Sequence, residues 1–242
     1  TVIKNITLTS TNLEDGNIVI DGLTPLTSYT ATLYNNESKR GVVDFTTTAK
    51  VPDADYTAFL QSSDSLNNDL FTTMAEAGYQ TVNIALPAGS IYYNENSLNI
   101  PDGMSVTFFG LPGEKQAIIG VKSIDIAGTH DFIKFENVEI TGASMKADGN
   151  NTINDYLFNQ SKASTVGSIE FSNSLINGFK NTPVRLQGSD IKVIDLVKFE
   201  NCTVFGADAR TYSLIHIDAS SGKGKIENIE FSKTTVIYSG KC

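Results

Sequence analysis

Two short segments of the chain, residues 182–187 (TPVRLQ) and 213–218 (SLIHID), carry the side chains best suited to chemistry. Aliphatic and polar residues alternate in both, which is typical of a β-strand with one buried face. If the aliphatic residues point inward, four polar side chains point outward: Arg185, Gln187, His216 and Asp218. An arginine beside a histidine and an aspartate could bind a ligand carboxylate or remove a proton α to one. All four are candidate binding residues, and Arg185, His216 and Asp218 are also the candidate catalytic residues.

An alternative interpretation is that these side chains form only a solvated face with polar pairs between strands. Catalysis by paired carboxylates would need two acidic residues set close together. The aspartates of this half of the chain are instead scattered, mostly in expected loops: Asp190, Asp195, Asp208 and Asp218. His130, the other histidine, is also expected in a loop, and no cluster with metal-ligand spacing stands out. The pattern therefore favours binding over catalysis and predicts no bound metal or cofactor.

An eight-residue motif that occurs four times predicts the strands that must position these residues. Its pattern is aliphatic, charged, Phe, polar, Asn, any two residues, aliphatic. The copies span residues 133–140, 169–176, 197–204 and 229–236, and their phenylalanines lie 36, 28 and 32 residues apart. Self-similarity at this period is the signature of a stacked repeat protein, and each unit here is strand-like. One further strand is expected after each motif, which gives three strands per coil.

The positions of the motif have structural explanations. The phenylalanines are expected to pile up in the core: Phe135, Phe171, Phe199 and Phe231. The asparagines tolerate a left-handed backbone, so they are expected to turn the chain between strands and to bond along the stack: Asn137, Asn173 and Asn201. Lys233 is the lapse at this position. The motif therefore sets the coil, and function is expected on the strand that follows it.

The charged position of the motif alternates in sign from copy to copy. It is occupied in turn by Lys134, Glu170, Lys198 and Glu230. Neighbouring strands lie about 4.8 Å apart, where opposite charges stabilise the pair. The alternation therefore predicts that the four strands pair consecutively, in parallel and in register.

Residues 70–120 carry a resemblance to a known superfamily. A helix is expected at about 68–77, followed by Gly78, a strand at 81–86, a Pro-Ala-Gly turn at 87–89 and Gly-Leu-Pro-Gly at 110–113. This order resembles the opening of pectin-lyase-like right-handed parallel β-helices, in which such a helix caps the first coil. The resemblance implies a glycan as ligand. In that superfamily, lyases use acidic residues to hold calcium together with an arginine base.

Residues 1–48 differ from the rest of the chain. Short strands are expected at 3–9, 17–21, 29–34 and 41–47. The run LTPLTSYTATL, residues 23–33, resembles the corner of a fibronectin type III domain, and Tyr29 would then be the corner tyrosine whose hydroxyl bonds back to the upstream backbone. The segment covers about half of such a domain, so we expect it to be incomplete.

The charge, the hydrophobicity and the cysteine count of the chain argue against several classes of protein. The chain has 27 acidic and 18 basic residues, a net charge of −9 and no basic cluster, so nucleic acid is not expected as a partner. No apolar run is long enough to span a membrane. The two cysteines, Cys202 and Cys242, do not make a disulfide framework, and both are expected to be free thiols.

These observations lead to one overall prediction. The fold is all-β: a fibronectin type III-like segment at 1–48, a linker at 49–55, and a three-stranded-per-coil right-handed parallel β-helix at 56–242. The combination resembles surface proteins of polysaccharide-using gut bacteria, which implies an extracellular protein, secreted or lipid-anchored, that is associated with polysaccharide or oligosaccharide. Because no cluster of carboxylates stands out, we expect a non-catalytic glycan-binding or scaffold module. The alternative is a calcium-dependent pectate-lyase-like enzyme acting on an acidic glycan, with Arg185 as base and Asp218 as a metal ligand. A further domain or subunit is expected at the C-terminal end of the β-helix.

Overall fold

The computed structural model describes residues 2–24, 27–47, 50–145, 149–205 and 213–237. The chain divides into two units, Thr1–Lys50 and Val51–Cys242, and each is described by itself. The boundary falls within the stretch 49–55 that the sequence suggested as a linker. Pro52 and Asp55 are nevertheless held against the second unit: the Asn83 amide donates to the Pro52 carbonyl, and the Asp55 carboxylate accepts from the backbone N–H groups of Gln80 and Thr81.

The first unit contains a short helix and one antiparallel hairpin, with strands β1 (Ser28–Asn35) and β2 (Ser38–Thr46). The expected strands at 29–34 and 41–47 are therefore present. Those expected at 3–9 and 17–21 are not, since neither stretch is a strand in the structure. Between them lies helix α1 (Ser10–Asp15), which the sequence analysis missed. Thr9 and Asn12 cap each other's backbone at its start, and such local bonds compete with strand pairing.

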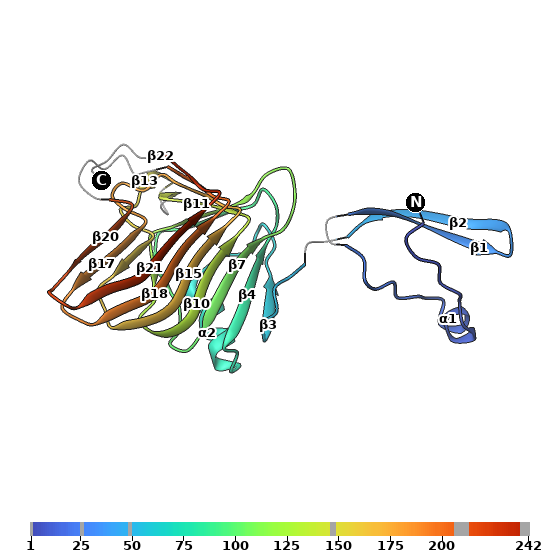
Figure 1. The fold of residues 1–242 in the computed structure, drawn as a ribbon, viewed down its shortest axis with the longest axis horizontal. Coiled ribbons are helices and arrows are strands. Elements are labelled where there is room, and N and C mark those ends of the chain that lie inside the picture. Colours follow the sequence, from blue (N-terminus) through green and yellow to red (C-terminus); the bar gives the residue numbers. More distant parts are fainter. Residues whose placement is uncertain (1, 25–26, 48–49, 146–148, 206–212, 238–242) are drawn as a thin grey trace. The chain divides into compact units, whose positions relative to one another are not determined.

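The second unit is a parallel β-helix of about six turns, built from three sheets (Figure 1). The seven-stranded sheet consists, in spatial order, of β3 (Tyr56–Phe59), β4 (Thr81–Leu86), β7 (Ser105–Gly110), β10 (Gly128–Glu136), β15 (Ser164–Ser172), β18 (Lys192–Glu200) and β21 (Gly224–Ser232). The six-stranded sheet consists of β5 (Ile91–Asn94), β8 (Ala117–Val121), β11 (Val138–Thr141), β16 (Leu175–Asn177), β19 (Thr203–Phe205) and β22 (Thr235–Ile237). The five-stranded sheet consists of β6 (Leu98–Asn99), β9 (Ile124–Asp125), β14 (Phe158–Gln160), β17 (Val184–Gly188) and β20 (Ile215–Ala219). A separate hairpin joins β12 (Ala143–Met145) to β13 (Asn151–Ile153).

The motif phenylalanines form a continuous column inside the β-helix, as predicted. Ring centroids lie 5.1 Å apart for Phe135 and Phe171, 4.8 Å for Phe171 and Phe199, and 5.0 Å for Phe199 and Phe231. Phe108 extends the column by one coil, stacking on Phe135 at 4.9 Å. Parallel pairing in register brings equivalent rings into contact. The same stacking of coils therefore explains both the repeat in the sequence and the column of rings in the core.

The asparagines of the motif turn the chain, as predicted. Asn137, Asn173 and Asn201 have φ values of 55°, 50° and 53°. Lys233 adopts the same left-handed conformation, with φ of 49°, although its side chain suits it less well. The Asn201 amide donates to the Asn173 side-chain oxygen at 2.7 Å, so the expected bonding along the stack is present at this step.

The alternating charges lie side by side. Lys134 pairs with Glu170, Glu170 with Lys198, and Lys198 with Glu230 across successive strands. Lys134 Nζ lies 3.3 Å from the Glu170 carboxylate. The pKa of Lys198 is raised chiefly by a hydrogen bond to Glu200, with Glu170 and Glu230 adding to the effect. The register predicted from the sign of four charges is therefore confirmed.

Helix α2 (Asn68–Glu76) covers the N-terminal end of the β-helix, close to the range expected from sequence. Asn67 caps its start, and Gly78, with φ of 85°, follows its end. Phe71 and Met74 are buried on its inner side. The Asn68 amide donates to the Ser97 carbonyl, just before β6, and its oxygen accepts from the Asn99 N–H within β6, so one side chain satisfies two backbone groups at this edge.

Candidate functional site

The register of the five-stranded sheet brings the candidate residues together. Asn159 on β14, Arg185 on β17 and His216 on β20 pair in one row, and Gln187 pairs with Asp218 two positions further along. Val184 and Leu186 are fully buried, so the predicted alternation on β17 is confirmed. We call the outward group the Arg185 patch. It consists of Tyr156, Asn159, Arg185, Gln187, His216 and Asp218.

Arg185 makes several contacts that fix the position of its side chain in the patch. Its Nη2 donates to Asp218 Oδ2 at 2.5 Å, and its Nη1 donates to the Tyr156 hydroxyl at 3.2 Å. The guanidinium also lies over the Tyr156 ring, 5.2 Å from the centroid. Its side chain is only 15% exposed, whereas that of Asp218 is 36% exposed. An ion pair, a hydrogen bond and a cation–π contact thus fix a mostly buried cation at the surface of the sheet.

His216 approaches the same carboxylate as Arg185 but less closely. Its Nε2 lies 3.8 Å from Asp218 Oδ2, beyond hydrogen-bond distance, and its side chain is 28% exposed. The three candidate catalytic residues therefore lie together, with Arg185 and His216 both directed at the Asp218 carboxylate. Among the residues the structure describes, no group of three or more His, Cys, Asp or Glu side chains is placed to hold a metal ion.

Tyr156 and Asn159 belong to the patch but were not singled out from sequence. Strand β14 begins only at Phe158, because Leu157 and Phe158 are both buried and the alternation of a strand breaks there. Tyr156 consequently points outward, where its hydroxyl accepts from Arg185 and from the Asn181 amide at 3.2 Å. The Asn159 side-chain oxygen is buried and has no hydrogen-bond partner in the structure. The signal that could have identified Asn159 was its position on the strand next to Arg185.

His130 does not lie in a loop, and this expectation was wrong. It is part of β10 and is only 2% exposed. Its Nδ1 lies 2.7 Å from the Met104 carbonyl oxygen and its Nε2 3.2 Å from that of Ala127. The strand begins two residues before His130, at a glycine, and bends so that both His130 and Ile133 face inward. The imidazole is therefore a core group rather than a ligand-facing one.

Two other reactive side chains are also buried. Cys202 is a free thiol, 3% exposed, and burial raises its pKa. Cys242 lies outside the described residues. Lys192 is fully buried, and its ammonium donates to the Asp190 carbonyl. Neither Cys202 nor Lys192 is accessible to a ligand.

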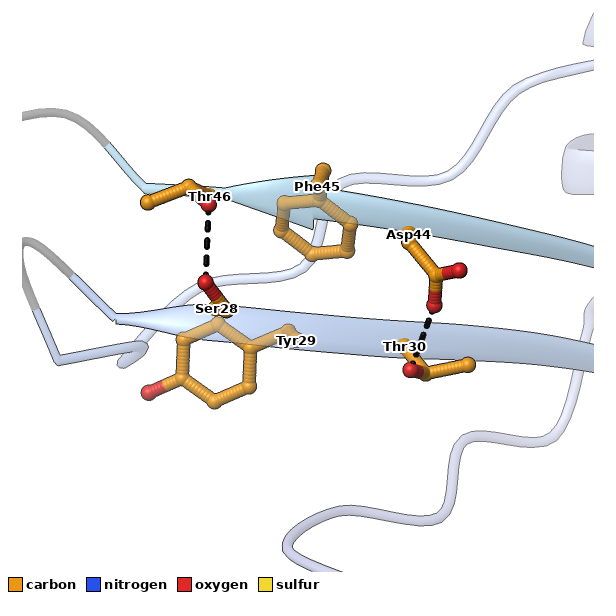
Figure 2. Close-up of a pocket in the computed structure, with 6 residues that line it drawn as sticks. All are labelled: Ser28, Tyr29, Thr30, Asp44, Phe45 and Thr46. Carbon is orange, nitrogen blue, oxygen red and sulfur yellow. Dashed lines mark hydrogen bonds between the residues drawn. The ribbon is translucent and has the colours of Figure 1, made fainter.

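A second surface feature lies on the hairpin of the first unit. An open hollow there is lined by Ser28, Tyr29, Thr30, Asp44, Phe45 and Thr46 (Figure 2). The rings of Tyr29 and Phe45 stack at 5.9 Å, and Thr30 donates to the Asp44 carboxylate at 2.6 Å. Ser28 and Thr46 also share a hydrogen bond, so the polar residues that line this hollow pair with one another across the two strands.

The comparisons with known proteins add no family to this description. No protein-family model, no curated protein and no solved structure matches the chain. Within the described part of the chain, both helices are too short to cross a membrane.

Proposed function

We propose that this chain is an extracellular, cell-surface or secreted protein that binds polysaccharide through the Arg185 patch without cleaving it. In this proposal the β-helix is pectin-lyase-like and serves as a rigid scaffold. The support is the parallel three-sheet coil, the capping helix α2 and the turn residues that follow it. Glycan binding along the outward face of a parallel sheet suits such a scaffold, because the strands hold side chains in fixed rows.

The observation that carries the proposal is the fixed position of Arg185. A sugar ligand is bound by planar, preorganised polar groups and by aromatic rings, since an immobile group loses little entropy on binding. Arg185 is clamped between Asp218 and Tyr156, and His216 lies beside it in the next strand. A guanidinium also favours a carboxylate on the ligand, so acidic polysaccharides should bind more tightly than neutral ones.

The same contacts support binding over elimination. An arginine that acts as the base of a lyase must be neutral when it takes the proton α to the sugar carboxylate. The ion pair with Asp218 stabilises the charged guanidinium, which carries donors only and cannot accept a proton. The calcium-dependent lyase alternative would also need Asp218 to leave Arg185 and turn to a metal ion. We therefore assign Arg185 a binding role.

For the first unit we propose a relation to fibronectin type III domains. The Tyr29 hydroxyl accepts a hydrogen bond from the Thr24 N–H at 2.8 Å, which is the upstream tie expected of a corner tyrosine. Tyr29 would thus be structural. With one hairpin in place of the expected four strands, the segment would be a spacer rather than a complete sandwich.

The test is a binding screen of the whole chain against acidic and neutral polysaccharides, with ultraviolet absorbance followed for unsaturated products. The key variant is Arg185→Gln, and the matched control is Lys134→Gln, which also removes an outward cation paired with a carboxylate on the next strand, but on a different sheet. We expect binding of acidic polysaccharide that Arg185→Gln weakens about tenfold or more and Lys134→Gln leaves unchanged.

Two outcomes would contradict the proposal. Formation of unsaturated product that Arg185→Gln abolishes would establish the lyase alternative. Equal weakening by both variants would mean that binding follows the overall charge of the β-helix rather than the Arg185 patch. Far-ultraviolet circular dichroism of each variant checks that the fold is retained.

A further inference from the structure

The outward face of the five-stranded sheet carries a line of polar side chains that extends beyond the Arg185 patch. We call it the polar row. Ile124 pairs with Phe158, so the residues that follow them, Asp125 and Asn159, lie side by side, and Asp125 points outward because Ile124 and Ile126 are buried. In spatial order the polar row consists of Asn99 on β6, Asp125 on β9, Asn159 on β14, Arg185 on β17 and His216 on β20.

The polar row contains one aspartate and one arginine, two strands apart. Neighbouring strands lie about 4.8 Å apart, so Asp125 and Arg185 are separated by about 10 Å along the row. Each is already paired with an opposite charge beside the row. Lys162 Nζ lies 2.9 Å from Asp125 Oδ2, and Arg185 Nη2 lies 2.5 Å from Asp218 Oδ2. These two ion pairs give the face no excess of positive charge.

An extended glycan gains the most polar contacts if it lies across the strands. Along β17 the outward polar positions are Arg185 and Gln187, whereas the polar row offers one side chain on each of five strands. One strand spacing is close to the length of one sugar unit, so successive sugars would meet successive strands. If one sugar carboxylate pairs with Arg185, the sugar two units away towards β6 then meets Asp125.

This geometry disfavours a ligand with a carboxylate on every sugar or on every second sugar. Such a ligand would set an anion directly beside Asp125, and like charges in that position are destabilising. The net charge of the chain, −9, also repels a dense polyanion. Three strands from Arg185, in contrast, the polar row reaches Asn99, which is neutral. Carboxylates spaced by three sugars or more therefore avoid the repulsion.

We propose that the Arg185 patch selects polysaccharides that carry a carboxylate on no more than one sugar in three, and that Asp125 excludes more densely charged chains. This inference rests on the proposed function, in which the patch binds glycan, and it specifies the class of glycan. Asp125 determines specificity in this account through repulsion, since the bound carboxylate itself pairs with Arg185.

The test is isothermal titration calorimetry of the whole protein with three oligosaccharides of equal length, at one ionic strength. They derive from polygalacturonate, hyaluronan and deacylated gellan, which carry a carboxylate on every sugar, every second sugar and every fourth sugar. The gellan fragment should bind about 2- to 5-fold more tightly than either of the others. Asp125→Asn should strengthen binding of the two denser fragments by about that factor and leave binding of the gellan fragment unchanged.

The matched control is Glu170→Gln. It also removes an outward carboxylate that is paired with a lysine, 3.3 Å from Lys134 Nζ, but on the seven-stranded sheet. It makes the same change in net charge and should leave the order of the three fragments unchanged. If Asp125→Asn fails to fold, Lys162→Gln serves instead, since this side chain is 65% exposed. Without its lysine, Asp125 should repel the denser fragments more strongly, so the preference for gellan should widen.

The possible results separate this inference from the proposed function. Polygalacturonate or hyaluronan fragments that bind the wild-type protein as tightly as the gellan fragment would overturn the inference and leave glycan binding intact. A preference that Asp125→Asn and Glu170→Gln alter equally would also overturn it, because the overall charge would then set the preference. If none of the three fragments binds, the proposed function fails and the inference fails with it.

Discussion

Phe171 and Phe231 occupy the same position in successive coils but should differ strongly in what they contribute to stability. Phe171 is fully buried and stacks on two rings, at 5.1 and 4.8 Å, so Phe171→Ala removes both stacks and leaves a closed cavity. Such a substitution costs about 3–5 kcal/mol. Phe231 is 49% exposed and stacks on one ring only, so Phe231→Ala removes roughly half the buried area and leaves no closed cavity. We expect a cost of about 1–2 kcal/mol.

The assay is equilibrium unfolding in guanidinium chloride, followed by far-ultraviolet circular dichroism. Both variants should keep the slope of the wild-type transition and shift its midpoint, by a larger amount for Phe171→Ala. The comparison is matched because the side chain and the local strand are the same. Equal shifts would refute the reasoning, since they would mean that the end of the β-helix is as closely packed as its middle.

Four further predictions follow from single side chains. Lys233→Asn should raise the free energy of unfolding by about 0.5–1 kcal/mol in chemical denaturation, because asparagine suits the left-handed backbone there; a loss of stability would contradict this account of the corner. Burial raises the pKa of Glu136 above its ordinary value of 4.5, so this carboxyl contributes stability below that value and loses it as pH rises through the folded-state pKa. Glu136→Gln should therefore raise Tm near neutral pH and leave it unchanged in acid, and an unchanged Tm at both would refute the role of burial. In a Cys242→Ser background, the buried Cys202 thiol should react with maleimide much more slowly in the native protein than in denaturant, and equal rates would show that it is accessible. Lys192→Met should raise Tm by about 2–4 °C in calorimetry, because methionine keeps the buried apolar stem and removes a buried charge that has one carbonyl acceptor. A lower Tm would mean that the hydrogen bond to this carbonyl stabilises the fold by more than burial of the charge destabilises it.

The β-helix could be predicted from sequence because its determinants are periodic. Phe135, Phe171 and Phe199 had to lie inward once the strands alternated, and in-register stacking then made them one column. The alternating charges reported the same register independently. Even the lapse at Lys233 left the fold intact, because its neighbours in the coil determine the turn and the side chain follows.

The remaining features depend on local geometry that carries no period. Tyr156 lies in the Arg185 patch because the two residues that follow it, Leu157 and Phe158, are both buried, which breaks the alternation of an ordinary strand. His130 moved from an expected loop into the core because its strand is longer than the motif. Residues 3–9 have strand-like alternation, but Thr9 caps a helix instead, and an isolated alternating segment has no sheet to join.

Hydrogen–deuterium exchange of the whole chain with and without an acidic oligosaccharide tests the central claim most directly. We predict slower exchange on binding in β14, β17 and β20, the strands that hold Asn159, Arg185 and His216, and no change in β1 and β2. Arg185→Gln should remove this protection. Protection confined to β1 and β2, or to the seven-stranded sheet, would contradict the assignment of glycan binding to the Arg185 patch.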